Sequence, residues 1–169
     1  FHVELVVSDF GRRLLMEELS VSADRLLPHL IETYGATVER GSLQLHSNKD
    51  LGAGIASGSH GCDGMVIVPC SMKTLAGVAH GLSRNLAERV ADVMLKERRP
   101  LILVPRETPM SLPQLRNMVT CAEAGAMVLP AMPAFYQGPK ELSDLADFMA
   151  GKILAALGLK HDLYPAWKE

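Results

Sequence analysis

Three short runs between residues 65 and 129 are apolar at every position. They are Met65–Val68, Leu101–Val104 and Ala126–Leu129, and each is followed at once by a proline. Strands that are apolar on both faces are typical of parallel sheets covered by helices on each side. Residues 1–7 alternate and then become wholly apolar, which predicts a further strand that enters a core.

Stretches with helical character separate these runs. Ser111, Pro113 and Gln114 supply an N-cap, a proline in the first turn and a capping-box residue for one of them. The expected helices and helical turns cover residues 11–18, 28–34, 51–56, 74–80, 86–98, 112–124 and 139–157, while residues 37–46 form either a short strand pair or one bent strand. The alternation predicts one α/β domain over residues 1–169, a three-layer fold with a doubly wound parallel sheet, and a C-terminal tail from about residue 158.

The composition narrows the classes of partner. The chain has 169 residues, of which 48% are hydrophobic and 21% charged, so wholesale disorder is excluded. A net charge of −2 gives no global positive field for nucleic acid or an anionic membrane, and no apolar run approaches the roughly 18 residues of a membrane span. Cys62, Cys70 and Cys121 show no metal-ligand spacing, so we expect no metal site and a reducing, cytoplasmic compartment.

Ligands of an open parallel sheet bind beyond the carboxyl ends of its strands. The polar residues directly after the apolar runs are therefore expected to share one rim. They are Ser8-Asp9, the turn of residues 71–74, residues 106–108, and a loop over 130–139 that carries Phe135 and Tyr136. Hydroxyls, helix N-terminal amides and an arginine together suit a phosphate. The residues alone thus indicate a phosphate- or nucleotide-binding domain.

Several of these residues also have a purely structural interpretation. Ser71 could serve only as a helix N-cap, and Asn85 with Glu88 looks like a capping box. Residues 96–99 close a helix, where cations offset the macrodipole. Cys70 ends a buried strand with no basic neighbour in sequence, which favours a buried thiol over a nucleophile.

Longer motifs add a more specific indication. Residues 69–77 read PCSMKTLAG, residues 91–101 read ADVMLKERRPL and residues 104–109 read VPRETP, while PAFY at 133–136 and LYPAW at 163–167 follow in order. With these motifs spread over nearly the whole chain, the sequence resembles the flavin prenyltransferase family. These are the UbiX-type enzymes that were formerly described as aromatic acid decarboxylases.

The resemblance implies both a fold and a reaction. Family members are flavodoxin-like, Rossmann-like FMN-binding proteins that assemble as homo-dodecamers and need no metal. They join a dimethylallyl group from dimethylallyl phosphate to N5 and then C6 of reduced FMN. The product, prenylated FMN, is used by a partner decarboxylase of the UbiD type.

The resemblance also implies roles for particular residues. Those that would contact FMN are Ser8, Ser71, Met72, Lys73, Thr74 and Arg106. Those that would surround the prenyl phosphate are Glu18, Lys96, Arg106, Glu107, Tyr136 and Lys152, with Trp167 closing over the site from the tail. Catalytic roles are expected for Glu107, Glu18 and Lys96. Cations stabilise the departing phosphate, and either Glu107 or the bound phosphate removes the C6 proton.

The sequence departs from the family pattern at two places. The family begins with a strand and a Gly-Ala-Ser-Gly turn that cradles the FMN phosphate, and neither is in this sequence. We therefore expect that the central first strand is missing here. Lys152 stands where many relatives have arginine, which keeps the charge but loses the bidentate fork.

Two other functions were weighed against this one. A flavin-dependent cysteine decarboxylase would carry a catalytic histidine after the first helix and a Pro-x-Met-Asn-x-x-Met-Trp motif, and neither is recognisable. A non-enzymatic FMN carrier would need the rim but not the additional cations Lys96 and Lys152.

Overall fold

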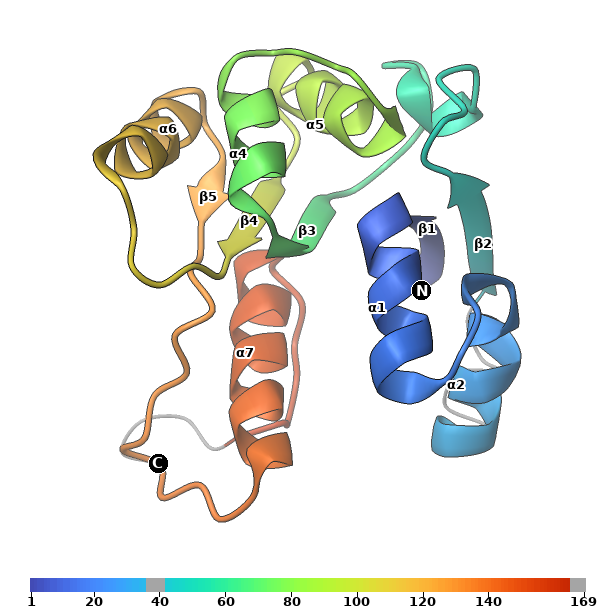
Figure 1. Ribbon diagram of the computed structural model, residues 1–169, viewed down its shortest axis with the longest axis vertical. Coiled ribbons are helices and arrows are strands. Elements are labelled where there is room, and N and C mark those ends of the chain that lie inside the picture. The colour runs from blue at the N-terminus through green and yellow to red at the C-terminus, as the bar shows by residue number, and fades with distance from the viewer. Residues whose placement is uncertain (36–41, 165–169) are drawn as a thin grey trace.

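The computed structural model describes residues 1–35 and 42–164 and contains two parallel sheets (Figure 1). In the first sheet β1 (His2–Val7) pairs with β2 (Ser42–Ser47). In the second sheet β4 (Leu101–Pro105) lies between β3 (Met65–Cys70) and β5 (Met127–Val128). All pairings are parallel, which confirms the predicted α/β class.

Helices follow the strands in the predicted order. They are α1 (Asp9–Leu19), α2 (Leu26–Tyr34), α4 (Met72–Ala79), α5 (Leu86–Lys96), α6 (Leu112–Glu123) and α7 (Leu142–Ala156), with short 3-10 turns η1 (Ala23–Arg25) and η2 (Gly54–Ala56). None of the helices in the described part of the chain is long and apolar enough to cross a membrane.

The structure refines the expected elements at three places. The expected single sheet is divided into two, because β1 and β3 have no ladder between them in the described residues. Residues Ser42–Ser47 form one strand beside β1, and the earlier part of the range 37–46 lies outside the described residues. The last helix begins at Leu142 instead of Pro139, because the Asp144 carboxylate accepts hydrogen bonds from the backbone N–H groups before it.

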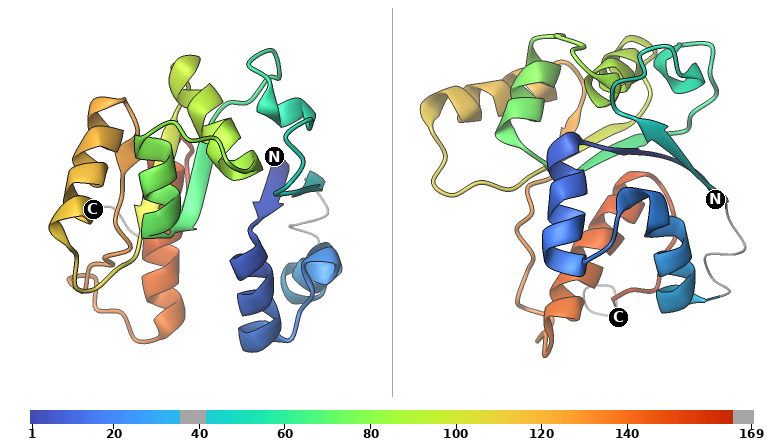
Figure 2. Two further views of the ribbon diagram at one scale, coloured as in Figure 1. Left: turned by 45° about the horizontal axis from the view of Figure 1, so that its top comes forward. Right: turned by 45° about the vertical axis from the view of Figure 1, so that its right-hand side comes forward.

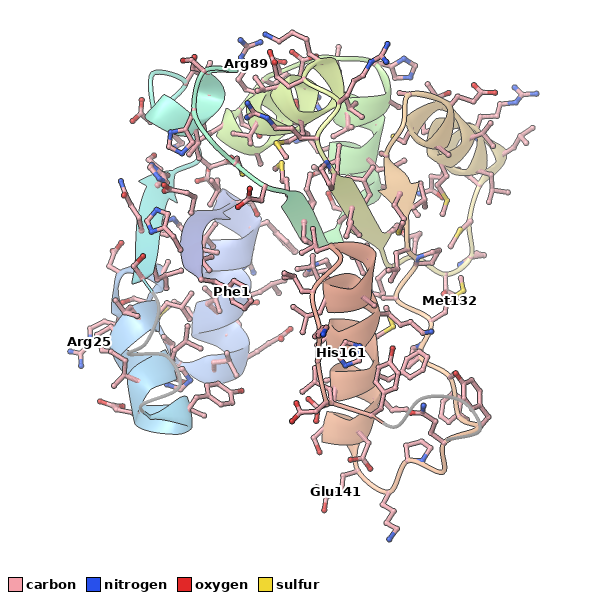
Figure 3. All side chains as sticks on the ribbon, turned by 180° about the vertical axis from the view of Figure 1, so that it is seen from behind. Phe1, Arg25, Arg89, Met132, Glu141 and His161 are labelled. Carbon is pink, nitrogen blue, oxygen red and sulfur yellow. The ribbon has the colours of Figure 1, made fainter. Side chains whose placement is uncertain are left out.

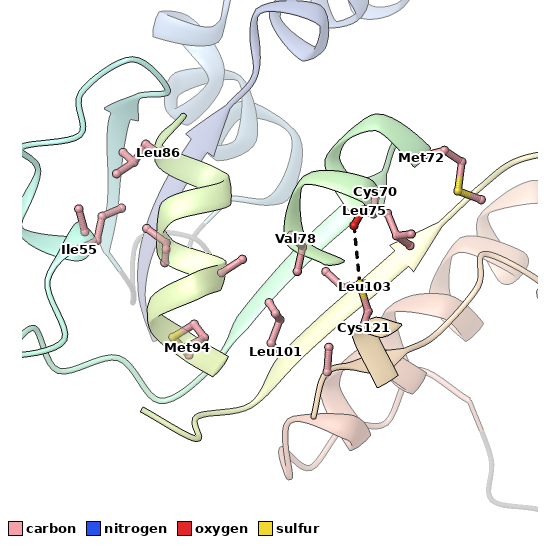
Figure 4. Close-up of a cluster of buried hydrophobic side chains, with 14 residues drawn as sticks. Ile55, Cys70, Met72, Leu75, Val78, Leu86, Met94, Leu101, Leu103 and Cys121 are labelled. Atoms are coloured by element: carbon pink, nitrogen blue, oxygen red, sulfur yellow. Dashed lines mark hydrogen bonds between the residues drawn. The ribbon is translucent and has the colours of Figure 1, made fainter. Parts of the chain in front are cut away.

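The main core lies between the second sheet and helices α4, α5 and α6 (Figure 4). Every residue of β4 is buried, and Leu75 on α4 and Leu86 on α5 are fully buried in the same core. Cys121 on α6 donates a weak hydrogen bond to the Leu75 carbonyl, 3.6 Å away. In contrast, Val68 on the outer strand β3 is 58% exposed. The central strand β4 therefore has the firmest packing in the molecule, directly before the expected rim.

Polar contacts join the first sheet to the rest of the chain. The Asn48 carbonyl accepts from the Leu86 N–H at 2.8 Å, so the end of β2 is fixed to the start of α5. The Glu4 carboxylate on β1 accepts from His46 on β2 and lies 3.7 Å from Nε2 of His60. The hydrogen bond from His46 lowers the pKa of Glu4. These contacts fix where β1 ends, and thereby the position of Ser8.

Glu88 is a buried carboxylate that fixes the start of α5 against α4. Burial by itself raises the pKa of Glu88, but hydrogen bonds from the Arg84 guanidinium and backbone outweigh it, so the net pKa is lowered. Gly77 on α4 faces this pair: a Cβ there would lie 2.6 Å from Cδ of Glu88. The close approach of the two helices therefore requires a glycine.

We expect Gly77→Ala to lower the free energy of unfolding by about 1–3 kcal/mol, because the added methyl must push the buried pair apart. Urea unfolding followed by circular dichroism measures this change. Gly61→Ala is the matched control, since a Cβ at Gly61 has no atom within 4 Å. Equal stabilities of the two variants would contradict this account of the α4–α5 contact.

Candidate active site

The carboxyl ends of the strands carry the predicted rim residues. In the left view of Figure 2, β1 (blue), β3 (green) and β4 (yellow) all run downward, so the residues that follow them lie toward the same side. Ser8 follows β1 and caps α1, where its Oγ accepts from the Gly11 N–H at 3.0 Å. Ser71 follows β3 and caps α4. Arg106 follows β4.

The register of β3 and β4 places two of these residues beside each other. Cys70, the last residue of β3, pairs with Pro105, the last residue of β4. Adjacent strands lie about 4.8 Å apart, so Ser71 and Arg106 leave the sheet as immediate neighbours. The N-terminus of α4 and the Arg106 backbone therefore form one continuous piece of the rim.

The turn after β3 offers donors for an anion. The Ser71 Oγ accepts from the Thr74 N–H at 3.2 Å and shares a hydrogen bond with the Thr74 hydroxyl at 3.0 Å. This cap confirms the structural role considered for Ser71. The first N–H groups of a helix have no intrahelical acceptor, so those of Met72 and Lys73 remain for a ligand. The positive end of the helix dipole lies at the same place.

Arg106 is exposed, and in the described part of the chain its guanidinium has no hydrogen-bond or ion-pair partner. The neighbouring Glu107 is half-buried, and its carboxylate accepts from the Thr108 N–H at 3.1 Å. The loop after β5 starts close by, since the Ala131 N–H donates to the Pro105 carbonyl at 2.9 Å. The rim thus combines the Arg106 guanidinium, the Glu107 carboxylate and the N-terminus of α4.

Tyr136 and Lys152 meet on the ring of Phe148. The Tyr136 ring stands edge-on to Phe148 with centroids 6.2 Å apart, and the Lys152 Nζ lies 5.4 Å from the Phe148 centroid. Tyr164 from the C-terminal segment packs on the same ring at 5.1 Å. His161 packs on Tyr164 at 4.8 Å. We call these four rings, Tyr136, Phe148, His161 and Tyr164, the aromatic cluster.

Two described residues of the expected site, Lys96 and Glu18, lie away from the rim within one chain. Lys96 ends α5 and precedes β4, whereas Arg106 follows β4. Because the five residues of this strand span about 16 Å, Lys96 and Arg106 lie at opposite ends of it. Glu18 is exposed on the last turn of α1, about 15 Å along the helix from Ser8. Trp167 lies outside the described residues.

Cys70 has no nucleophilic role at this rim. Its side chain is 1% exposed, and burial raises the pKa of the thiol to about 12, so it stays protonated at neutral pH. The burial predicted for this cysteine is confirmed. A protonated, enclosed thiol is a poor nucleophile.

Sequence reasoning missed the part that Phe148, His161 and Tyr164 take in holding Lys152. In the sequence, Phe148 is only an apolar position of the helix expected over residues 139–157, and nothing there links it to Lys152. One signal in the sequence was Gly151, because a glycine inside a helical stretch often marks a close approach of other groups.

Comparison with known proteins identifies the family to which this chain belongs. The Flavoprotein family matches residues 1–154. The flavin prenyltransferase UbiX of Halalkalibacterium halodurans is 46% identical over 169 residues, which is 100% of this chain and 81% of that protein. The chain is thus a member of the Flavoprotein family of α/β proteins. Within that family it belongs to the flavin prenyltransferases of the UbiX type.

Two solved structures share the fold closely. The crystal structure of AnUbiX in complex with FMN and dimethylallyl pyrophosphate has a TM-score of 0.85 to this chain, at 37% sequence identity. The match covers 98% of this chain and 82% of AnUbiX. A dodecameric FMN-dependent UbiX-like decarboxylase from Escherichia coli O157:H7 has the same TM-score and identity, over 98% of this chain and 83% of that one. The flavodoxin-like arrangement expected from the resemblance is therefore confirmed.

Proposed function

We propose that this protein transfers a dimethylallyl group from dimethylallyl phosphate to N5 and C6 of reduced FMN, making prenylated FMN. The observation that carries the proposal is the pairing of Cys70 with Pro105, which sets the N-terminus of α4 beside Arg106, whose guanidinium has no partner among residues 1–35 and 42–164. Such a constellation suits a phosphorylated ligand. A relative of the same fold binds FMN and dimethylallyl pyrophosphate together.

The residues at the rim fit FMN. Ser8 lies at the end of β1, while the turn of residues 71–74 and Arg106 lie at the ends of β3 and β4. Hydroxyls, first-turn amides and a guanidinium provide donors for the carbonyl oxygens and ring nitrogens of a flavin. FMN would supply the nucleophilic N5 and C6 atoms, so the chain itself needs no nucleophile. The buried, protonated thiol of Cys70 is consistent with a reaction in which the protein supplies no nucleophile.

The prenyl phosphate would lie among the cations. Its allylic C–O bond would break with the electron pair leaving on phosphate, and the allylic carbon would bond N5 of the flavin, which would release its proton. Ring closure would then form a bond between C6 and one carbon of the former alkene, with loss of the C6 proton and addition of a proton at the other alkene carbon. Arg106 and Lys152 would neutralise the departing oxygens, and Tyr136 would donate a hydrogen bond to them. Glu107, half-buried beside Arg106, or the released phosphate would take the C6 proton.

We further propose that the working site needs more than one copy of the chain. Lys96 lies at the end of β4 opposite Arg106, and Glu18 lies about 15 Å along α1 from Ser8, so a neighbouring copy would supply them. Helix α6 presents an apolar stripe that suits such contacts, with exposed Leu112, Leu115 and Val119 at 58%, 45% and 57%. A relative of the same fold is dodecameric.

Assembly is measured by multi-angle light scattering at micromolar concentration, where we expect the mass of a homo-oligomer, and of a dodecamer in particular. Because the exposed stripe on α6 would then be covered, Leu115→Glu should lower that mass. A monomer in both variants would contradict the shared site.

The product is proposed to serve a UbiD-type decarboxylase, and the cytoplasm is the proposed place of action. All three cysteines are free thiols, which suits a reducing compartment. The two alternatives remain less well supported. A cysteine decarboxylase lacks its motif here, and a simple FMN carrier does not need Lys152 beside Tyr136.

The proposal is tested by anaerobic incubation of reduced FMN with the protein and dimethylallyl phosphate, followed by mass spectrometry of the released flavin. We expect a gain of one C5H8 unit. A parallel incubation with the pyrophosphate tells which donor is used. FMN of unchanged mass with both donors would contradict the proposed activity.

Arg106→Ala should weaken FMN binding by about 10- to 100-fold, because it removes charge-assisted hydrogen bonds. The melting temperature should stay the same, since the side chain is exposed and has no partner in the described residues. Flavin fluorescence titration and a thermal melt measure the two effects. Loss of the cooperative melt would instead show that Arg106 is part of the fold.

Lys152→Ala should raise the KM for dimethylallyl phosphate about three- to tenfold while FMN binding stays unchanged, since one cation beside the phosphate is lost. Lys152→Arg should retain or improve activity because it restores a bidentate fork. Lys140→Ala, an exposed lysine shortly before the same helix, is the control. An unchanged KM in Lys152→Ala would assign this lysine to the solvated surface.

A further inference from the structure

Gly151 forms a notch in α7 that receives the C-terminal segment of residues 159–164. A Cβ on Gly151 would lie 2.4 Å from Cε1 of Tyr164 and 2.7 Å from Cε1 of His161. Both distances are shorter than real Cβ contacts allow, so the two rings pack directly against the helix backbone. Figure 3 shows His161 beside this helix.

The chain reverses direction immediately after α7 to reach this notch. Gly158 has a φ of 75°, in the left-handed region that favours glycine, and the Leu159 N–H donates to the Leu154 carbonyl at 2.9 Å. The segment then runs back along the helix it has just left. The turn at the end of α7 therefore directs the chain so that Tyr164 packs on Gly151.

Tyr164 in this seat contacts the groups around Lys152. The Lys152 Nζ lies 5.9 Å from the Tyr164 centroid and 5.4 Å from the Phe148 centroid. The two rings are 5.1 Å apart at an angle of 31°. A cation within about 6 Å of an aromatic face is attracted to it, and two such faces restrict where the ammonium can lie.

We propose that Tyr164 is a positioning residue: seated in the Gly151 notch, it holds the Lys152 ammonium toward the prenyl phosphate. This inference rests on the proposed function. Lysine has a flexible stem and gives up the rigid fork that arginine would offer. The two aromatic faces supply the restraint that the lysine side chain lacks, so the ammonium is already placed when the phosphate arrives.

A restraint of this kind acts on the prenyl donor and not on the flavin. Displacing Tyr164 leaves the Ser71 turn and Arg106 untouched, because they follow β3 and β4 and do not lie on α7. The expected signature is therefore a higher KM for dimethylallyl phosphate with unchanged FMN affinity. A general loss of packing would lower stability and alter both.

The test uses four variants of the full-length protein. Gly151→Ala and Tyr164→Ala should each raise the KM for dimethylallyl phosphate about two- to fivefold, the effect of losing one exposed cation–π contact. Tyr164→Phe keeps the ring and should behave like the wild type. Gly61→Ala adds a methyl in open space and is the matched control.

A double-mutant cycle separates positioning from packing. In a Lys152→Ala background, Gly151→Ala should produce no further rise in KM, because the group that the notch positions is absent. Hydrogen exchange of residues 159–164 reports whether the segment has left its seat. Additive effects in the cycle, or a KM that neither Gly151→Ala nor Tyr164→Ala changes, would overturn the inference while leaving the transferase intact. A wild-type protein that forms no prenylated flavin would overturn the proposed function itself, and the inference with it.

Discussion

The pairing of Cys70 with Pro105 is the constraint on which the site depends. The register of β3 and β4 shifts between Ile67 and Cys70, but the strands still pair at their last residues, so the residues that follow leave the sheet side by side. Ser71 begins α4 at this point, and Arg106 leaves the neighbouring strand beside it. The buried strand β4 holds this end rigidly, because every one of its residues is enclosed by the core.

The second half of the site is built differently. Tyr136 and Lys152 come from a loop and a helix, and aromatic packing on Phe148 brings them together. Such contacts are weaker and less directional than a strand ladder, and a further element, the C-terminal segment on Gly151, completes them. A rigid rim would suit the flavin of the proposed reaction, and a cation restrained by aromatic rings would suit its small phosphate.

Much of this arrangement could be predicted from the sequence because it follows from chain connectivity. Ser71 and Arg106 come shortly after apolar runs, and they identify the rim once the sheet is known to be parallel. The separation of Lys96 from Arg106 follows from the same topology, but motif resemblance conceals it, since a motif says which residues belong to a site and not which subunit supplies them. The seat of Tyr164 could not be predicted, because it depends on a ring meeting a helix backbone at Gly151. In sequence, a helical glycine can indicate a close approach, but it does not say which ring makes it.

The most direct test is a crystal structure of the protein with FMN and dimethylallyl phosphate bound. The account predicts the flavin ring against the turn of residues 71–74 and Arg106, and the prenyl phosphate within hydrogen-bond distance of Arg106, Tyr136 and Lys152. It also predicts that Lys96 at the same phosphate belongs to a neighbouring copy. A flavin bound at the amino ends of the strands, or a prenyl phosphate held away from Arg106, would contradict it.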